Sequence, residues 1–94
     1  MIKSFAHKGL KKLFEDGDRS GLPAKQIDRI TAILAILNTA TKPADVNFPG
    51  SDFHPLKGDR KGEYAVKITG NYRICFSFDK AEKAALDVNY EDYH

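Results

Sequence analysis

Apolar residues recur at helical spacing in the first part of the chain. In residues 7–17, HKGLKKLFEDG, the side chains of Leu10, Leu13 and Phe14 are three and four positions apart, as on one face of a helix. Gly17 follows, and glycine commonly ends a helix because it tolerates a left-handed backbone. The pattern predicts a short helix that ends at Gly17.

A second and longer helical pattern occupies residues 24–40, AKQIDRITAILAILNTA. Pro23 precedes it, and proline suits the first turn of a helix. Its broad apolar stripe consists of Ile27, Ile30, Leu34 and Leu37. We expect a helix that buries this stripe. The next stretch, residues 41–62, is rich in proline and glycine and predicts a loop, with a short extended piece around residues 53–56.

After residue 62 the apolar period changes to two, which predicts strands. Gly70 and Asn71, between the first two runs, are a hairpin signal. The apolar positions that share one face of the sheet are Tyr64, Val66, Ile68, Tyr72, Ile74, Phe76, Phe78, Leu86, Val88 and Tyr90. Helices followed by an antiparallel meander form an α+β pattern. We expect a single domain, residues 1–94, in which two N-terminal helices pack on one face of a small antiparallel β-sheet.

The other face of this sheet has no predicted cover. By alternation it carries Lys67, Arg73, Cys75, Ser77, Glu91 and Tyr93. The loop HPLKGDRKG runs into the start of the same sheet and brings a histidine and three cations within reach: His54, Lys57, Arg60 and Lys61. This free face is therefore the candidate functional surface.

Composition narrows the class of protein. With 41% apolar and 30% charged residues, the 94-residue chain fits one soluble globular domain. A single cysteine excludes an internal disulfide, and neither a signal peptide nor a membrane span is visible, so we expect a cytoplasmic protein. Residues 1–29 hold seven Lys or Arg against four Asp or Glu, and residues 54–73 hold five against two, so each segment is +3. Such segments suit a polyanionic partner, although a solvated charged face is the commoner explanation.

The free face has the groups that RNA cleavage without a metal requires. The 2′-hydroxyl must lose a proton as it attacks the phosphorus, and the leaving 5′-oxygen must gain one. His54 and His94 suit these transfers near neutral pH, and Arg73 and Lys57 suit the developing phosphate charge. A tyrosine such as Tyr93 can stack on a base. The histidines lack the spacing of metal ligands, so we expect neither a metal nor another cofactor.

Each candidate also has a purely structural interpretation. Arg73 can form cross-strand ion pairs with Glu63 or Glu91. The remaining candidates would then be surface or packing residues: Lys57 and Arg60 in a solvated loop, Asp92 at a solvated end, Tyr93 at the edge of the core, and Cys75 as a small packed side chain. The residues alone therefore indicate a small α+β domain with a basic face that acts on RNA or binds it.

Three motifs carry a resemblance to a known family: LKGDR-x-G, NYRI-x-F and the final DYH. Together with the two N-terminal helical stretches, they resemble the HigB toxins of the RelE/ParE superfamily over nearly the whole chain. The resemblance implies a microbial-ribonuclease-like fold and a ribosome-dependent mRNA interferase that cuts the codon in the ribosomal A site and so stops translation. It also implies two partners, the 70S ribosome with its mRNA and a helix-turn-helix, HigA-like antitoxin that neutralises the toxin and binds the operator.

The resemblance also assigns residues. His54 and Lys57 fall in the loop that the family places at its active site, Arg73 on the arginine that contacts the scissile phosphate, and Asp92, Tyr93 and His94 on its catalytic C-terminal tripeptide. We hypothesise that one histidine is the general base and the other the general acid, that Asp92 orients a histidine, and that Tyr93 positions the base or the 2′-hydroxyl. The implied ribosomal RNA contacts are Lys8, Lys11, Lys12, Arg60 and Lys61.

Two other functions fit part of the pattern. A ParE-like toxin of the same superfamily inhibits DNA gyrase and is not expected to need His54, Lys57 and the DYH motif. A non-catalytic module would use the basic face only to bind RNA or a protein, and would not depend on the histidines.

Overall fold

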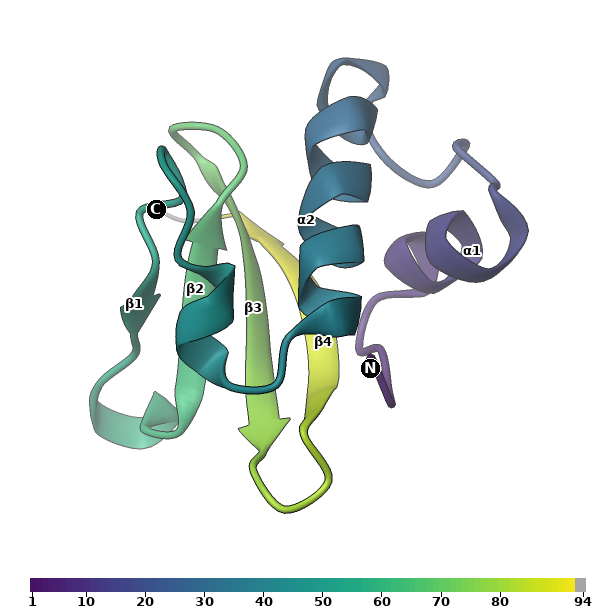
Figure 1. The fold of residues 1–94 in the computed structure, drawn as a ribbon. Coiled ribbons are helices and arrows are strands. Elements are labelled where there is room, and N and C mark those ends of the chain that lie inside the picture. Colours follow the sequence, from purple (N-terminus) through teal and green to yellow (C-terminus); the bar gives the residue numbers. More distant parts are fainter. Residues whose placement is uncertain (93–94) are drawn as a thin grey trace.

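The structure, a computed structural model, describes residues 1–92. Its helices and strands are α1 (Lys8–Asp16), α2 (Ile27–Thr39), β1 (His54–Pro55), β2 (Glu63–Lys67), β3 (Tyr72–Asp79) and β4 (Ala84–Asp92). The strands form one antiparallel sheet in the order β1-β2-β3-β4, so the predicted α+β class is confirmed (Figure 1). Neither helix of this described part has the length and apolar character needed to cross a membrane.

The ends of α1 follow from two residues. The Nδ1 atom of His7 accepts a hydrogen bond from the backbone N–H of Leu10, which caps the first turn. At the other end Gly17 has a φ of 71° and donates its N–H to the carbonyl of Leu13. Because only glycine adopts this conformation without steric cost, the predicted end of the helix is confirmed.

Helix α2 provides one side of the core. All four residues of the predicted stripe are buried: Ile27, Ile30, Leu34 and Leu37. They share one apolar cluster with sheet residues such as Val66, Ile74, Phe76 and Val88. Figure 1 shows α2 upright beside the sheet with α1 on its far side. The apolar face of the sheet is therefore the inner face of the protein.

The sequence pattern gave the wrong face for Leu86. The core position is taken by the fully buried Ala85, whereas Leu86 pairs with Ser77 on the opposite face. The register shifts between Cys75 and Ser77, and Asp87 has a φ of 52°. A bulge of this kind places an extra residue in one strand, so strict alternation fails on one side of it.

The N-terminal segment extends the sheet beyond β4, which the sequence pattern did not predict. Ile2 forms a parallel bridge with Ala85, and Phe5 forms one with Val88. Backbone hydrogen bonds run in both directions between this segment and β4; for example, the N–H of Lys3 donates to the carbonyl of Ala85 at 2.8 Å. This segment satisfies backbone groups that an open sheet edge would leave to solvent.

The burial of α2 gives a first prediction. Leu34→Ala removes a side chain that is 1% exposed, and such truncations lower the free energy of unfolding by about 3 kcal/mol. Thr31→Ala on the exposed side of the same helix should change it by less than about 0.5 kcal/mol. Urea denaturation of both variants measures the difference, and equal stability of the two would contradict the assigned core.

Candidate active site

The register of the sheet places the predicted free-face residues in rows. Residues directly opposite each other in antiparallel strands share a face. One row consists of His54, Ala65, Cys75 and Asn89, and the next consists of Lys67, Arg73 and Glu91. His54 and Arg73 are therefore on the same face, in neighbouring rows.

Arg73 is fixed on this face by the hairpin turn. Its Nη1 atom donates to the carbonyl of Thr69 at 2.6 Å and to that of Tyr72 at 3.1 Å. Its Nη2 atom lies 3.8 Å from the Asp52 carboxylate, and only 8% of its side chain is exposed. The guanidinium is thus a fixed positive charge whose geometry comes from backbone carbonyls.

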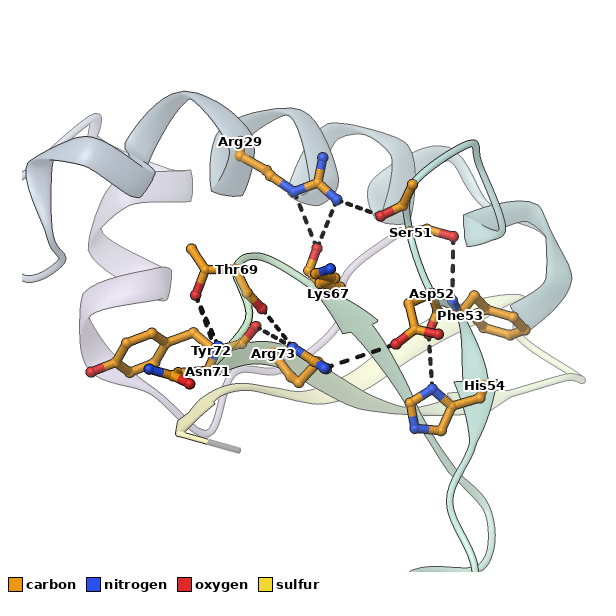
Figure 2. A network of polar contacts seen from close by, with 11 residues as sticks. Arg29, Ser51, Asp52, Phe53, His54, Lys67, Thr69, Asn71, Tyr72 and Arg73 are labelled. Atoms are coloured by element: carbon orange, nitrogen blue, oxygen red, sulfur yellow. Dashed lines mark hydrogen bonds and ion pairs between the residues drawn. The ribbon is translucent and has the colours of Figure 1, made fainter. Parts of the chain in front are cut away.

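His54 is held by the same loop residue. Its Nδ1 atom lies 2.8 Å from the backbone carbonyl of Asp52. A carbonyl only accepts hydrogen bonds, so Nδ1 carries the hydrogen and Nε2 is the ring atom that can take up or release a proton. Figure 2 shows Asp52 between the two groups, with its carbonyl toward His54 and its carboxylate toward Arg73.

Asp52 lies in a loop that is tied to β2 and α2. The buried Ser51 accepts through its carbonyl from Lys67 N–H at 2.7 Å. Arg29 of α2 donates to the carbonyls of Gly50 and Lys67, each at 2.9 Å (Figure 2). The proline- and glycine-rich composition predicted a loop, but no sequence pattern links Asp52 to Arg73 or Arg29 to this loop. These contacts were therefore missed by the sequence analysis.

Arg60 has an ion-pair role that the sequence analysis did not assign to it. Its guanidinium forms two hydrogen bonds to the Glu91 carboxylate, at 2.7 and 2.6 Å, and another to Glu63 at 2.8 Å. These are the two carboxylates proposed above as partners of Arg73. The pairing raises the pKa of Arg60 and lowers that of Glu91. For the predicted RNA contact, Arg60 would therefore have to reach RNA while its ion pairs join β2 to β4.

Cys75 lies on β3 between the strands that Arg60 joins. It is 3% exposed, and burial first, followed by the nearby Glu91 charge, raises the pKa of its thiol to about 12. A thiol with such a pKa is protonated at neutral pH and is a poor nucleophile. This supports the interpretation of Cys75 as a packed residue.

Two predicted lysines line a surface pocket next to β1. The pocket has a volume of about 690 Å³ and is formed by Pro55, Leu56, Lys57, Gly58, Lys61, Gly62 and Tyr64. Both lysines are exposed. Lys57 follows His54 by three residues, so the pocket adjoins the histidine along the chain and adds positive charge to that edge of the sheet.

The remaining predicted residues lie elsewhere or outside the described part. Asp92 pairs with Tyr72, one position along β4 from the Arg73–Glu91 pair. Helix α1, which carries the exposed Lys8, Lys11 and Lys12, contacts β4, whereas His54 is on β1 at the opposite edge of the sheet (Figure 1). Tyr93 and His94 lie outside the described residues. Within residues 1–92 no three histidine, cysteine, aspartate or glutamate side chains converge as metal ligands would.

Comparison with known proteins identifies the family. The family described as "RelE-like toxin of type II toxin-antitoxin system HigB" matches residues 3–94. The chain belongs to this HigB-like toxin family. The resemblance drawn from the sequence motifs, and with it the class of type II toxin, is confirmed.

Two relatives of this HigB-like chain match over its whole length. "Endoribonuclease HigB" from Proteus vulgaris is 49% identical over 94 residues, which cover 100% of both chains. "Toxin HigB-1" from Vibrio cholerae serotype O1 is 30% identical over 96 residues, covering 100% of this chain and 98% of that protein. The prediction of an endoribonuclease agrees with the name of the Proteus vulgaris protein.

A more distant likeness concerns a solved structure. The solution structure of conserved hypothetical protein HP0892 from Helicobacter pylori superposes with a TM-score of 0.46 and 21% identity, covering 98% of this chain and 94% of that one. This likeness is too distant to bear on the site.

The Arg60–Glu91 pair gives a pH-dependent prediction. Because the pKa of Glu91 is lower in the folded state than its unfolded value of about 4.3, the carboxylate stabilises the fold above that pH, and this contribution disappears as the pH falls through the folded value. Glu91→Gln should therefore be less stable than the wild type between about pH 6 and 7, and the difference should close below about pH 4.

Denaturation at each pH measures this difference. Glu15→Gln, at an exposed position of α1, is the matched control and should show no comparable difference. A stability difference for Glu91→Gln that stays constant down to pH 3, or one that the control shares, would contradict the assigned ion pair.

Proposed function

We propose that this chain is a ribosome-dependent mRNA endoribonuclease that cleaves mRNA in the ribosomal A site and so inhibits translation. One observation carries the proposal: Asp52 joins His54, a proton-transfer group, to Arg73, a fixed phosphate-binding group, on one face of the sheet. The family and the endoribonuclease from Proteus vulgaris, 49% identical, support the same reaction.

The reaction needs two proton transfers around one phosphorus atom. The 2′-oxygen forms a bond to phosphorus and gives up its proton, while the bond from phosphorus to the 5′-oxygen breaks and that oxygen takes up a proton. The Nε2 atom of His54 acts in one transfer and His94 in the other. Arg73 and Lys57 stabilise the negative charge of the phosphorane. In this scheme Asp92 orients a histidine and Tyr93 positions the base or the 2′-hydroxyl.

The proposed architecture is RelE-like and microbial-ribonuclease-like. Both helices cover the apolar face of the sheet, and the RNA lies on the opposite face. The single apolar cluster that contains residues of α1, α2 and the sheet supports this arrangement. The rows that contain His54 and Arg73 would then face the substrate.

Two macromolecular partners complete the proposal. A helix-turn-helix, HigA-like antitoxin neutralises the toxin in an operator-binding complex, and the 70S ribosome presents the mRNA. The lysines of α1 contact ribosomal RNA on one side of the protein, and Lys61 does so at the β1 edge. Arg60 contributes through the charge that remains on its partly exposed guanidinium. This activity places the protein in the cytoplasm.

The requirement for ribosomes separates this function from its alternatives. Purified protein should cut an mRNA only when ribosomes translate it, and primer extension should map the cuts within codons. In cells, translation should fail before DNA damage signalling begins. Early DNA damage with intact mRNA would favour a gyrase-inhibiting, ParE-like toxin, and cleavage of free mRNA at the same rate would contradict ribosome dependence.

The histidines give the sharpest prediction of chemistry. His54→Ala and His94→Ala should each lower the cleavage rate by at least about 100-fold, because general acid or base catalysis typically contributes that much. Ribosome binding and thermal stability should stay close to those of the wild type. His7→Asn is the matched control, since asparagine is also a good helix N-cap. Full activity of His54→Ala would favour a non-catalytic binding module.

A further inference from the structure

A second cation lies directly opposite Arg73. In the β2–β3 ladder Lys67 is the partner of Arg73, so the two side chains leave the sheet on the same face. Like charges at directly opposed positions destabilise a strand pair. The next residue in this row, Glu91, is hydrogen-bonded to Arg60, so the pair of cations can take up a further anion.

One anion close to Arg73 is Asp52. Its carboxylate is 3.8 Å from Arg73 Nη2, longer than a hydrogen bond, and its side chain is 62% exposed. The preceding residue, Ser51, is bonded through its carbonyl to the N–H of Lys67. Asp52 therefore faces the guanidinium of Arg73 and follows the residue that holds the backbone of Lys67, and its exposed carboxylate can turn away into solvent without unfolding the loop.

The backbone of Lys67 is more firmly fixed than that of a typical surface lysine. Its N–H donates to Ser51 at 2.7 Å, and its carbonyl accepts from Arg29 Nε at 3.2 Å and Arg29 Nη2 at 2.9 Å. Arg73 is fixed by the turn carbonyls described above. Two cations on fixed backbone positions form a preorganised site, which costs little ordering entropy when an anion binds.

We propose that Lys67 and Arg73 form a two-cation seat for a phosphodiester of the RNA, and that the Asp52 carboxylate occupies this seat until RNA displaces it. This inference rests on the proposed function. It adds Lys67 to the substrate-binding residues and gives Asp52 the role of a resident counter-ion. The Nη2 atom of Arg73, which faces Asp52, donates to a phosphate oxygen, while Lys67 supplies a movable point charge.

The backbone of Asp52 allows its charge to be removed alone. Its φ of 48° lies in the left-handed region, which aspartate and asparagine tolerate better than other residues with a side chain. Asp52→Asn therefore keeps the loop and the carbonyl that holds His54. Lys67→Gln likewise removes one charge while its backbone hydrogen bonds remain.

The test measures binding of an uncleavable RNA. Fluorescence anisotropy with a short 2′-O-methyl single-stranded RNA should give Lys67→Gln a Kd raised about threefold and a salt dependence reduced by roughly 0.7 in slope, as expected for one lost phosphate contact. Asp52→Asn should lower the Kd by about the same factor. Lys80→Gln and Glu15→Gln, both at exposed positions away from this face, control for the change in net charge.

Inorganic phosphate identifies the position of the seat. In a titration followed by NMR, phosphate should shift the amide signals of Lys67 and Arg73 at lower concentration in Asp52→Asn than in the wild type. The inference is overturned if Lys67→Gln binds RNA as Lys80→Gln does, or if Asp52→Asn binds RNA no more tightly than Glu15→Gln. Binding differences of the expected kind in a protein that cleaves no mRNA would support the seat and contradict the proposed function.

Discussion

Arg29 holds together the parts of the protein on which the rest of the site depends. It projects from α2, whose apolar stripe provides one side of the core. Its guanidinium donates hydrogen bonds to carbonyls at the end of β2 and in the loop before β1. Its cation also lies 5.6 Å from the ring centre of Phe48 in that loop. The loop has no regular ladder of its own, so these contacts fix the position of Asp52, and through it the geometry of His54 relative to Arg73.

The sequence predicted the features that local periodicity determines. The stripe of α2 and the hairpin before Tyr72 follow from spacing, and the end of α1 follows from the conformational freedom of Gly17. The face that carries Arg73 could also be predicted, because the alternation of the two faces is unbroken along β2 and β3. The face of Leu86 does not follow, because the bulge near Asp87 depends on how β4 meets both β3 and the N-terminal segment.

Two arginines show why the site could be predicted only in part. Arg60 and Arg73 are equivalent as charges in the sequence, and both were candidates for RNA contact. Arg60 has two carboxylates within hydrogen-bond distance, whereas Nη1 of Arg73 donates to a backbone carbonyl and its Nη2 lies 3.8 Å from the Asp52 carboxylate. Which arginine can bind a phosphate of the substrate depends on pairings between residues up to 31 positions apart, as for Arg60 and Glu91. No local pattern encodes such pairings.

The charge arrangement on the free face is a compromise between folding and binding. Arg60 pairs with Glu63 and Glu91 and so stabilises the sheet, and it also holds the carboxylate of Glu91, the residue opposite Arg73. Asp52, which lies near Arg73 of the neighbouring row, is on a loop and largely exposed. A counter-ion on a loop is easier to displace than one on a strand, because its side chain can move without breaking the ladder. In the proposed reaction a phosphate can therefore replace Asp52 beside Arg73 without disturbing the ion pairs that stabilise the sheet.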